Sequence, residues 1–151
     1  MAEFEIYFEE EIKKHGPEHG AEIVEYFIIV SAHPILNLPQ KSAVIQIFEH
    51  IVYVIQNNED LKGYVPQLVG CILKFFNDPS DKVRYNAISS IYNVFKFMDE
   101  ECLLVFARTF KELPCIITDP AAEVRQAAAH LNHTMKTLLN NAILDHYQFD
   151  Y

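Results

Sequence analysis

The chain has 151 residues, half of them hydrophobic, and a formal net charge of -9. This length and apolar content suit one folded domain and exclude a disordered or collagen-like chain. The negative charge disfavours direct binding to nucleic acid or to a bare anionic membrane, because phosphate groups and the protein carry the same sign.

The N-terminus is acidic and lacks the basic residues and long apolar stretch of a secretory signal. No apolar stretch approaches the roughly 20 residues that cross a bilayer, so no membrane insertion is expected. Cys71, Cys102 and Cys115 are odd in number and form no CxxC spacing, which predicts buried thiols in a reducing compartment. We therefore expect a cytoplasmic protein.

Apolar residues recur three and four positions apart over long windows, so the sequence predicts an all-α protein. The first four predicted helices span about 2–14, 21–31, 41–56 and 61–76. The stretch from His15 to Gly20 is predicted to separate the first two helices, and Pro34 and Pro39 are predicted to bracket a loop before the third. Pro66 is compatible with the fourth helix because it lies near the first turn, where its missing N–H is not needed.

The pattern D-P-x-x-x-V-R then occurs twice, from Asp78 to Arg84 and from Asp119 to Arg125. The two copies are 41 residues apart, inside the period of about 40 to 47 that is typical of HEAT and armadillo arrays of stacked helix pairs. The repeat predicts a short right-handed α-solenoid of about three HEAT/armadillo-like helix pairs. Chance occurrence of the two matches in an ordinary helical bundle is the alternative.

Each residue type in the pattern has a physical role. The Asp can accept the free N–H groups at the start of the next helix, and the Pro has its φ already set for the helix opening. Val83 and Val124 are expected to turn into the shared core, and small Ala87 and Ala128 to let two helices approach closely. Each Arg can reach the Asp of an adjacent corner, which predicts a ladder that fixes the spacing of the repeats.

A degenerate earlier copy begins at Lys41, 43 residues before Arg84, and keeps the basic residue but lacks the Asp and the Val. The second helix of each pair is thus predicted to begin near Lys41, Ser80 and Ala121. We expect one HEAT-repeat domain over 1–151, made of N-terminal helices (1–32), repeat helices (39–76, 80–112 and 120–141) and a tail (142–151).

Three short motifs indicate a particular family among HEAT-repeat proteins. Residues 76–78 read Phe-Asn-Asp, residues 84–87 read Arg-Tyr-Asn-Ala, and residues 91–94 read Ile-Tyr-Asn-Val. In these motifs the chain resembles the N-terminal HEAT region of the Vac14 family, and the resemblance extends over about 31–141. Family members are several times longer, so we expect a fragment or a reduced protein that kept the N-terminal array.

The resemblance implies a non-catalytic protein-protein interaction scaffold. Its partner would be the PIKfyve/Fab1-type kinase that makes phosphatidylinositol 3,5-bisphosphate, with the antagonistic phosphatase as a second partner, and it would reach endosomal or vacuolar membranes through these partners. A HEAT-repeat adaptor of an unrelated cytosolic complex is the alternative. An enzyme is not expected, since the sequence contains no nucleophile elbow, phosphate-binding loop or HExxH motif, and no cofactor is expected either.

Two histidine pairs have spacings that could place two imidazoles on one helix face, His15 with His19 and His130 with His133. The first pair lies beside Gly16, Pro17 and Gly20, where a helix is not expected, and the second pair lacks a nearby Cys or carboxylate to complete a tetrahedral set. No metal site is therefore predicted.

Partner-binding residues are instead sought on the second helices, which line the concave surface of such arrays. The candidates for partner binding are Tyr85, Tyr92, Gln126 and His133. The residues predicted to form the corners and the ladder are Asp78, Arg84, Asp119 and Arg125.

Overall fold

The computed structural model describes residues 2–98 and 103–147, and every regular element in these ranges is helical. The helices are α1 (Ala2–His15), α2 (Pro17–Ser31), α3 (Leu38–Ile55), α4 (Val65–Lys74), α5 (Asp81–Met98), α6 (Leu103–Ile117) and α7 (Ala122–Tyr147). Two 3-10 turns, η1 (Lys62–Tyr64) and η2 (Phe75–Asn77), flank α4. The prediction of an all-α fold is confirmed.

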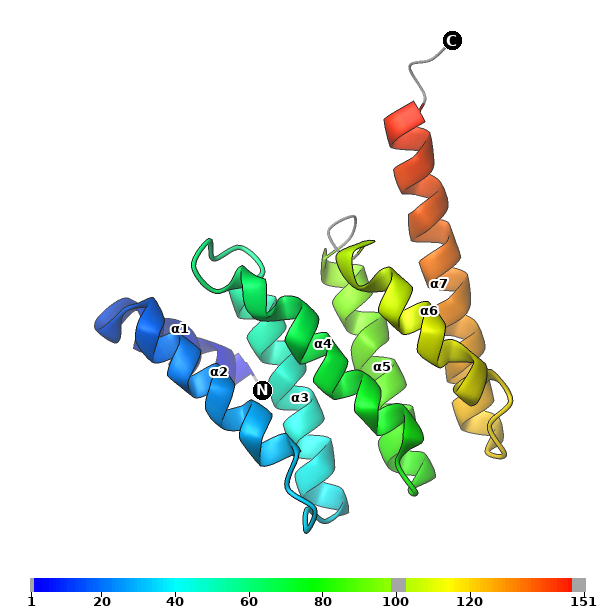
Figure 1. Cartoon of the computed structure of the whole chain (residues 1–151), viewed down its shortest axis with the longest axis horizontal. Helices are drawn as coiled ribbons and strands as arrows, with labels where there is room; N and C mark the ends of the chain where they lie inside the picture. The colour runs from blue at the N-terminus through cyan, green and yellow to red at the C-terminus, as the bar shows by residue number, and fades with distance from the viewer. Residues whose placement is uncertain (1, 99–102, 148–151) are drawn as a thin grey trace.

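The helices stack in two layers (Figure 1). Helices α2, α4 and α6 form the first layer, and α4 contacts both of its neighbours there. Helices α3, α5 and α7 form the second layer, where α5 packs between the other two, and α1 packs on α2 and α3. Successive pairs α2–α3, α4–α5 and α6–α7 therefore form a solenoid-like array, as the 41-residue repeat predicts. The right-handed sense of the array stays a prediction.

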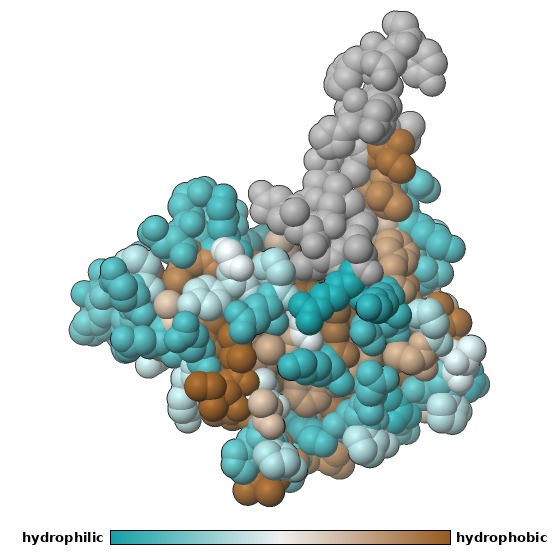
Figure 2. Space-filling model, viewed as in Figure 1, coloured by the Kyte–Doolittle hydropathy of each residue, from teal (hydrophilic) through white to brown (hydrophobic). Residues whose placement is uncertain are grey.

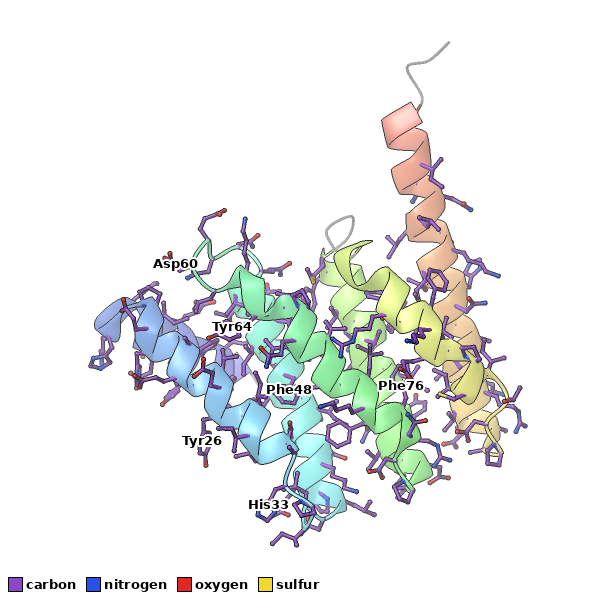
Figure 3. The ribbon with its side chains drawn as sticks, in the orientation of Figure 1. Tyr26, His33, Phe48, Asp60, Tyr64 and Phe76 are labelled. Carbon is purple, nitrogen blue, oxygen red and sulfur yellow. The ribbon has the colours of Figure 1, made fainter. Side chains whose placement is uncertain are left out.

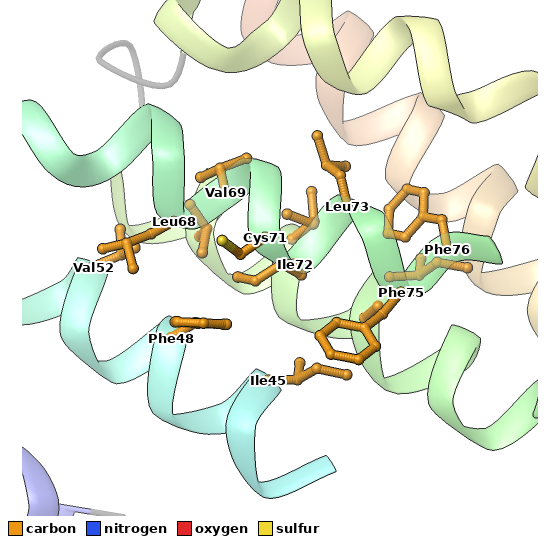
Figure 4. Close-up of a cluster of buried hydrophobic side chains, with 14 of the residues drawn as sticks. Ile45, Phe48, Val52, Leu68, Val69, Cys71, Ile72, Leu73, Phe75 and Phe76 are labelled. Carbon is orange, nitrogen blue, oxygen red and sulfur yellow. The ribbon is translucent and has the colours of Figure 1, made fainter. Parts of the chain in front are cut away.

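The hydrophobic core lies between the two layers. Ile45, Phe48 and Val52 of α3 face Leu68 and Ile72 of α4, and all five side chains are buried (Figure 4). Large buried side chains such as Phe48 recur along the array, as Figure 3 shows. Each such side chain contributes about 1.5 to 3 kcal/mol by leaving water, so interlayer packing holds the helices in place.

The break between the first two helices is shorter than predicted. Only Gly16, with a φ of +86°, separates them, and α2 begins at Pro17. Gly20 lies inside α2 and is buried, and a Cβ on it would approach side-chain atoms of Ile12 and Leu61 to 2.9 Å. Gly20 is therefore a point of close approach between chain segments and not a helix breaker.

Helix α3 begins at Leu38, before the predicted start near Lys41, so Pro39 lies in its first turn. Asn37 Oδ1 accepts a hydrogen bond from the Gln40 N–H at 2.9 Å, and Gln40 Oε1 accepts one from the Asn37 N–H at 2.9 Å. This capping box satisfies two free donors at the helix start, and Pro39 in the first turn needs no N–H.

The last two helices extend beyond their predicted limits. Helix α6 runs to Ile117 with Pro114 inside it, past the expected end at 112. Helix α7 runs to Tyr147, so residues 142–147 of the predicted tail are helical. No Gly or Pro occurs within α7 to end it. The remainder of the tail, 148–151, lies outside the described residues.

The cysteines differ in environment. Cys71 is buried, as predicted, and burial raises the pKa of its thiol. Cys115 is exposed, so the prediction of a buried thiol is wrong there, and its Sγ donates to the Glu112 carbonyl at 2.8 Å. The helical period places Cys115 on the outer side of α6, whereas its neighbour Ile116 enters the core. Cys102 lies outside the described residues.

Candidate partner-binding groove

Two equivalent corners open the second helices α5 and α7. Asp78 Oδ2 accepts a hydrogen bond from the Ser80 N–H at 3.0 Å, and Asp119 Oδ1 accepts one from the Ala121 N–H at 2.9 Å. Each Asp thus closes an Asx turn with the residue two positions later. The proline after each Asp lies in this turn, two residues before the helix begins, and not at the first helical position.

Basic residues connect each corner to the preceding second helix. Arg84 Nε and Nη2 donate to Asp119 Oδ2 and Oδ1 at 2.7 and 3.0 Å, and Lys41 Nζ lies 2.7 Å from Asp78 Oδ1. Arg84 Nη1 also donates to the Asp78 carbonyl at 2.8 Å, and Arg125 Nη1 donates to the Asp119 carbonyl at 2.7 Å. We call the two ion pairs the corner ladder. It joins α3 to the corner before α5, and α5 to the corner before α7.

The Arg84–Asp119 pair is largely shielded from water. Asp119 is 4% exposed, and burial by itself would raise the pKa of its carboxyl group. Hydrogen bonds from Arg84 and from the Ala121 N–H outweigh this effect, so the pKa lies below its ordinary value. The same hydrogen bond from the arginine raises the pKa of Arg84. Both groups are therefore charged at neutral pH.

The second layer is hollowed on both sides of α5. A hollow of about 700 Å³ lies between α5 and α7, and one of about 390 Å³ lies between α3 and α5. The two share Ser89 and Asn93 and so form one continuous surface, the second-layer groove. Its lining residues are Ile45, Gln46, Glu49, His50, Tyr85, Asn86, Ile88, Ser89, Ser90, Tyr92, Asn93, Glu123, Gln126, Ala127 and His130.

The structure brings three of the four predicted partner-binding residues together in this groove. Tyr85, which is 43% exposed, Tyr92 and Gln126 line it. His133 is exposed on α7 but does not line the groove. His130 takes its place, and its ring lies against Tyr92 with centroids 4.6 Å apart.

The helical period does not separate His130 from His133. Gln126, His130 and His133 follow the i, i+4, i+7 spacing of one helix face, so all three lie on the same side of α7. His133 lies farther along α7 than His130, beyond the residues that line the groove. Where the groove ends depends on how the helices stack, and the sequence alone contains no signal for it.

Polar side chains tie α5 to α3 along the groove floor. Asn86 Nδ2 donates to Ser42 Oγ at 2.9 Å, and Asn93 Nδ2 donates to Glu49 Oε1 at 3.2 Å. These contacts could not be predicted from the sequence, because they join residues more than 40 positions apart whose pairing depends on how the helices stack.

The other histidine pair straddles the α1–α2 break. The rings of His15 and His19 lie 5.1 Å apart, and each has a nitrogen within 3.5 Å of Glu11 Oε2. Over the part of the chain that the structure describes, no cluster of three or more His, Cys, Asp or Glu side chains is arranged to hold a metal ion.

A second exposed surface lies on the N-terminal side of the first layer. Tyr26 and Ile29 of α2 are 62% and 73% exposed, and Ile35 in the following loop is 79% exposed. Figure 2 shows apolar surface over α2 among largely hydrophilic neighbours, and Figure 3 shows Tyr26 pointing away from the helices. We call these three residues the α2 surface. Exposed apolar side chains in a group are typical of contact surfaces.

Comparison with known proteins identifies the class of this array. The model of the family described as Vacuolar 14 Fab1-binding region matches residues 40–137, well over half of the chain. The chain belongs to this family. The predicted resemblance to Vac14 proteins is therefore confirmed, and the matched segment contains every residue of the second-layer groove.

Two relatives align over about half of the chain. It is 32% identical over 80 residues to the vacuole morphology and inheritance protein 14 of Saccharomyces cerevisiae, covering 53% of this chain and 9% of that protein. It is 28% identical over 79 residues to the VAC14 homolog of Arabidopsis thaliana, covering 52% and 11%. The matched part is thus about a tenth of each relative's length. No solved structure matches the chain.

Proposed function

We propose that this chain is a non-catalytic scaffold that binds a Fab1-type phosphoinositide kinase through the second-layer groove. One observation carries the proposal: the segment matched by the Fab1-binding family, residues 40–137, includes all residues that line the groove. The same segment leaves out α1, α2 and the whole α2 surface.

The groove has the composition of a protein-binding site. Tyr85 presents a large ring that is partly open to solvent, and Gln126 on the opposite wall is exposed. Tyrosines that become buried at the centre of an interface are among the residues that contribute most to binding. The corner ladder holds the two walls at a fixed separation, so little ordering is needed when a partner binds.

The scaffold would reach vacuolar or endosomal membranes through the kinase. No helix in the described ranges is long and apolar enough to cross a membrane. The net charge of -9 also opposes contact with anionic lipid, so recruitment through a protein is favoured. The antagonistic phosphatase, implied by the family resemblance alone, stays a prediction.

The α2 surface supports a second candidate function, that of an adaptor in another complex. Its three apolar residues are each more exposed than Tyr85 of the groove, and they lie outside the matched segment. A partner unrelated to the kinase would be expected to cover this surface.

One binding experiment separates the two functions. The full chain is immobilised, and the affinity of a purified Fab1-type kinase is measured for the wild type and for variants. The double variant Tyr85→Ala/Gln126→Ala should weaken binding by about tenfold or more, as loss of an interface tyrosine typically does. Tyr26→Ala, which truncates a tyrosine on the α2 surface that is more exposed than Tyr85, should leave the affinity unchanged.

Tyr92 is left intact in this design because its half-buried ring packs on His130, so that its removal would also disturb the α5–α7 contact. Circular dichroism checks that each variant keeps its helicity. Binding that is lost in Tyr26→Ala and kept in the groove variant would favour the adaptor function, and absence of any binding to the kinase would refute the proposal.

A further inference from the structure

We infer that the second-layer groove holds an extended, basic peptide segment of its partner and recognises the peptide backbone through side-chain carboxamides. This inference rests on the proposed function and states which part of the kinase would be bound. Four carboxamides from three helices line the groove: Gln46 of α3, Asn86 and Asn93 of α5, and Gln126 of α7.

A carboxamide matches a peptide group because it offers both a donor and an acceptor. The structure gives the side chains of Gln46 and Gln126 no hydrogen bond to any described residue, and both are exposed. Asn86 and Asn93 donate through Nδ2 to neighbouring side chains, which leaves each Oδ1 able to accept. All three walls can therefore bond to a partner's main chain.

Ser90 provides an independent sign of a missing polar partner. It borders the hollow between α3 and α5 and is only 3% exposed, and its Oγ has no hydrogen-bond partner. Buried hydroxyl groups are nearly always hydrogen-bonded, because an unpaired one has lost water without replacement. A polar chain lying in the groove would supply that partner.

The dimensions suit an extended chain. Packed helices lie about 8 to 10 Å apart, so a ligand crossing from α3 to α7 spans about 16 to 20 Å. An extended peptide rises about 3.3 Å per residue and covers this span with about five or six residues. A helical ligand would keep its backbone groups bonded internally and could not use the carboxamides.

The charges select the sequence of that peptide. Glu49 and Glu123 line the groove, and neither hollow is lined by Lys or Arg. Lys96 does not line either hollow, although its Nζ lies 5.6 Å from the centre of the Tyr92 ring. Tyr85 adds an exposed ring face that can hold a cationic side chain. Lysine and arginine are therefore the residues expected in the bound segment.

The test uses 15-residue fluorescent peptides that tile the sequence of the Fab1-type kinase, with binding to the full chain measured by fluorescence polarisation. Binding of the intact kinase is measured in parallel. We expect at least one basic tile to bind and to compete with the intact kinase. The binding tile is then made in two N-methylated forms, with methyl groups on alternate residues in either register.

In an extended peptide, the backbone N–H groups of alternate residues point to opposite sides of the chain. Methylation in the register that faces the groove should weaken binding at least tenfold, whereas methylation in the other register should have little effect. Gln46→Ala/Gln126→Ala should weaken the unmodified tile by a similar factor. The matched control, Gln67→Ala, removes an exposed glutamine on α4 outside the groove and should bind like the wild type.

The outcomes distinguish this inference from the proposed function. If the intact kinase binds but no linear tile does, or if both methylated forms bind equally well, the peptide inference is overturned and the scaffold function stands. If the glutamine variant binds the tile as tightly as Gln67→Ala, carboxamide recognition is overturned. If neither the kinase nor any tile binds, both proposals are overturned.

Discussion

The corner ladder gives a sharp prediction for stability, because replacing Asp119 by Ala removes three hydrogen bonds at once. The carboxylate accepts two bonds from Arg84 and one from the Ala121 N–H. Loss of the hydrogen bond that closes the Asx turn costs about 1 kcal/mol. Removing one partner of a buried ion pair costs about 3 to 5 kcal/mol, since the other charge is left unpaired.

The lower end of that range applies here. The Arg84 side chain is 13% exposed and still donates to the carbonyl oxygens of Asp78 and Pro79, so part of its hydrogen bonding survives. We expect Asp119→Ala to lower the free energy of unfolding by about 3 to 4 kcal/mol in total. For a domain of this size, that is a drop in melting temperature of roughly 6 to 16 °C.

Urea denaturation followed by circular dichroism measures this change. Asp60→Ala, which removes an exposed carboxylate in the α3–α4 loop, is the control and should change the free energy of unfolding by less than about 0.5 kcal/mol. A loss of only about 1 kcal/mol in Asp119→Ala would be explained by the Asx turn alone. The ion pair would then contribute nothing to the stability of the array.

Three further predictions concern pH, packing and thiol reactivity. The folded pKa of Asp119 lies below its ordinary value, so its ion pair stabilises the fold above about pH 4 and is lost as the pH falls through the folded pKa. In urea denaturation, acid should therefore lower the free energy of unfolding of the wild type more steeply than that of Asp119→Asn. Gly20→Ala should destabilise by about 1 kcal/mol or more through crowding, whereas Gly63→Ala, with open space at its Cβ, should not; equal melting curves would contradict the close approach at Gly20. Iodoacetamide should modify Cys115 before Cys71, as judged by peptide mass spectrometry, and the reverse order would contradict their assigned exposure.

The sequence specified the repeat architecture because its strongest signals are local. The D-P-x-x-x-V-R pattern combines a turn, a helix start and a core position within one short segment. Val83 and Val124 are indeed buried, as are Ala87 and Ala128 one turn later. Such features depend on neighbours in the chain, so they can be identified without knowing how the helices pack.

Helix ends and the groove depend on contacts that a single sequence does not display. Gly20 looks like a helix breaker, yet it lies in α2 because close packing at Ile12 and Leu61 requires a residue without a Cβ. The groove is lined by residues of α3, α5 and α7, and these residues come together only when the helices stack. The choice of His133 over His130 shows the same limit on a smaller scale, since both lie on the same helix face and only the stacked structure shows that the groove ends at His130.

The central claim is that the kinase covers the second-layer groove, and hydroxyl-radical footprinting of the full chain with and without the kinase tests it most directly. Tyr85 and Tyr26 are both solvent-exposed, on the groove and on the α2 surface respectively, so each reports on one face of the same molecule. The account predicts that adding the kinase protects Tyr85 and His130 from oxidation and leaves Tyr26 reactive. Protection of Tyr26 with unchanged oxidation of Tyr85 would contradict it.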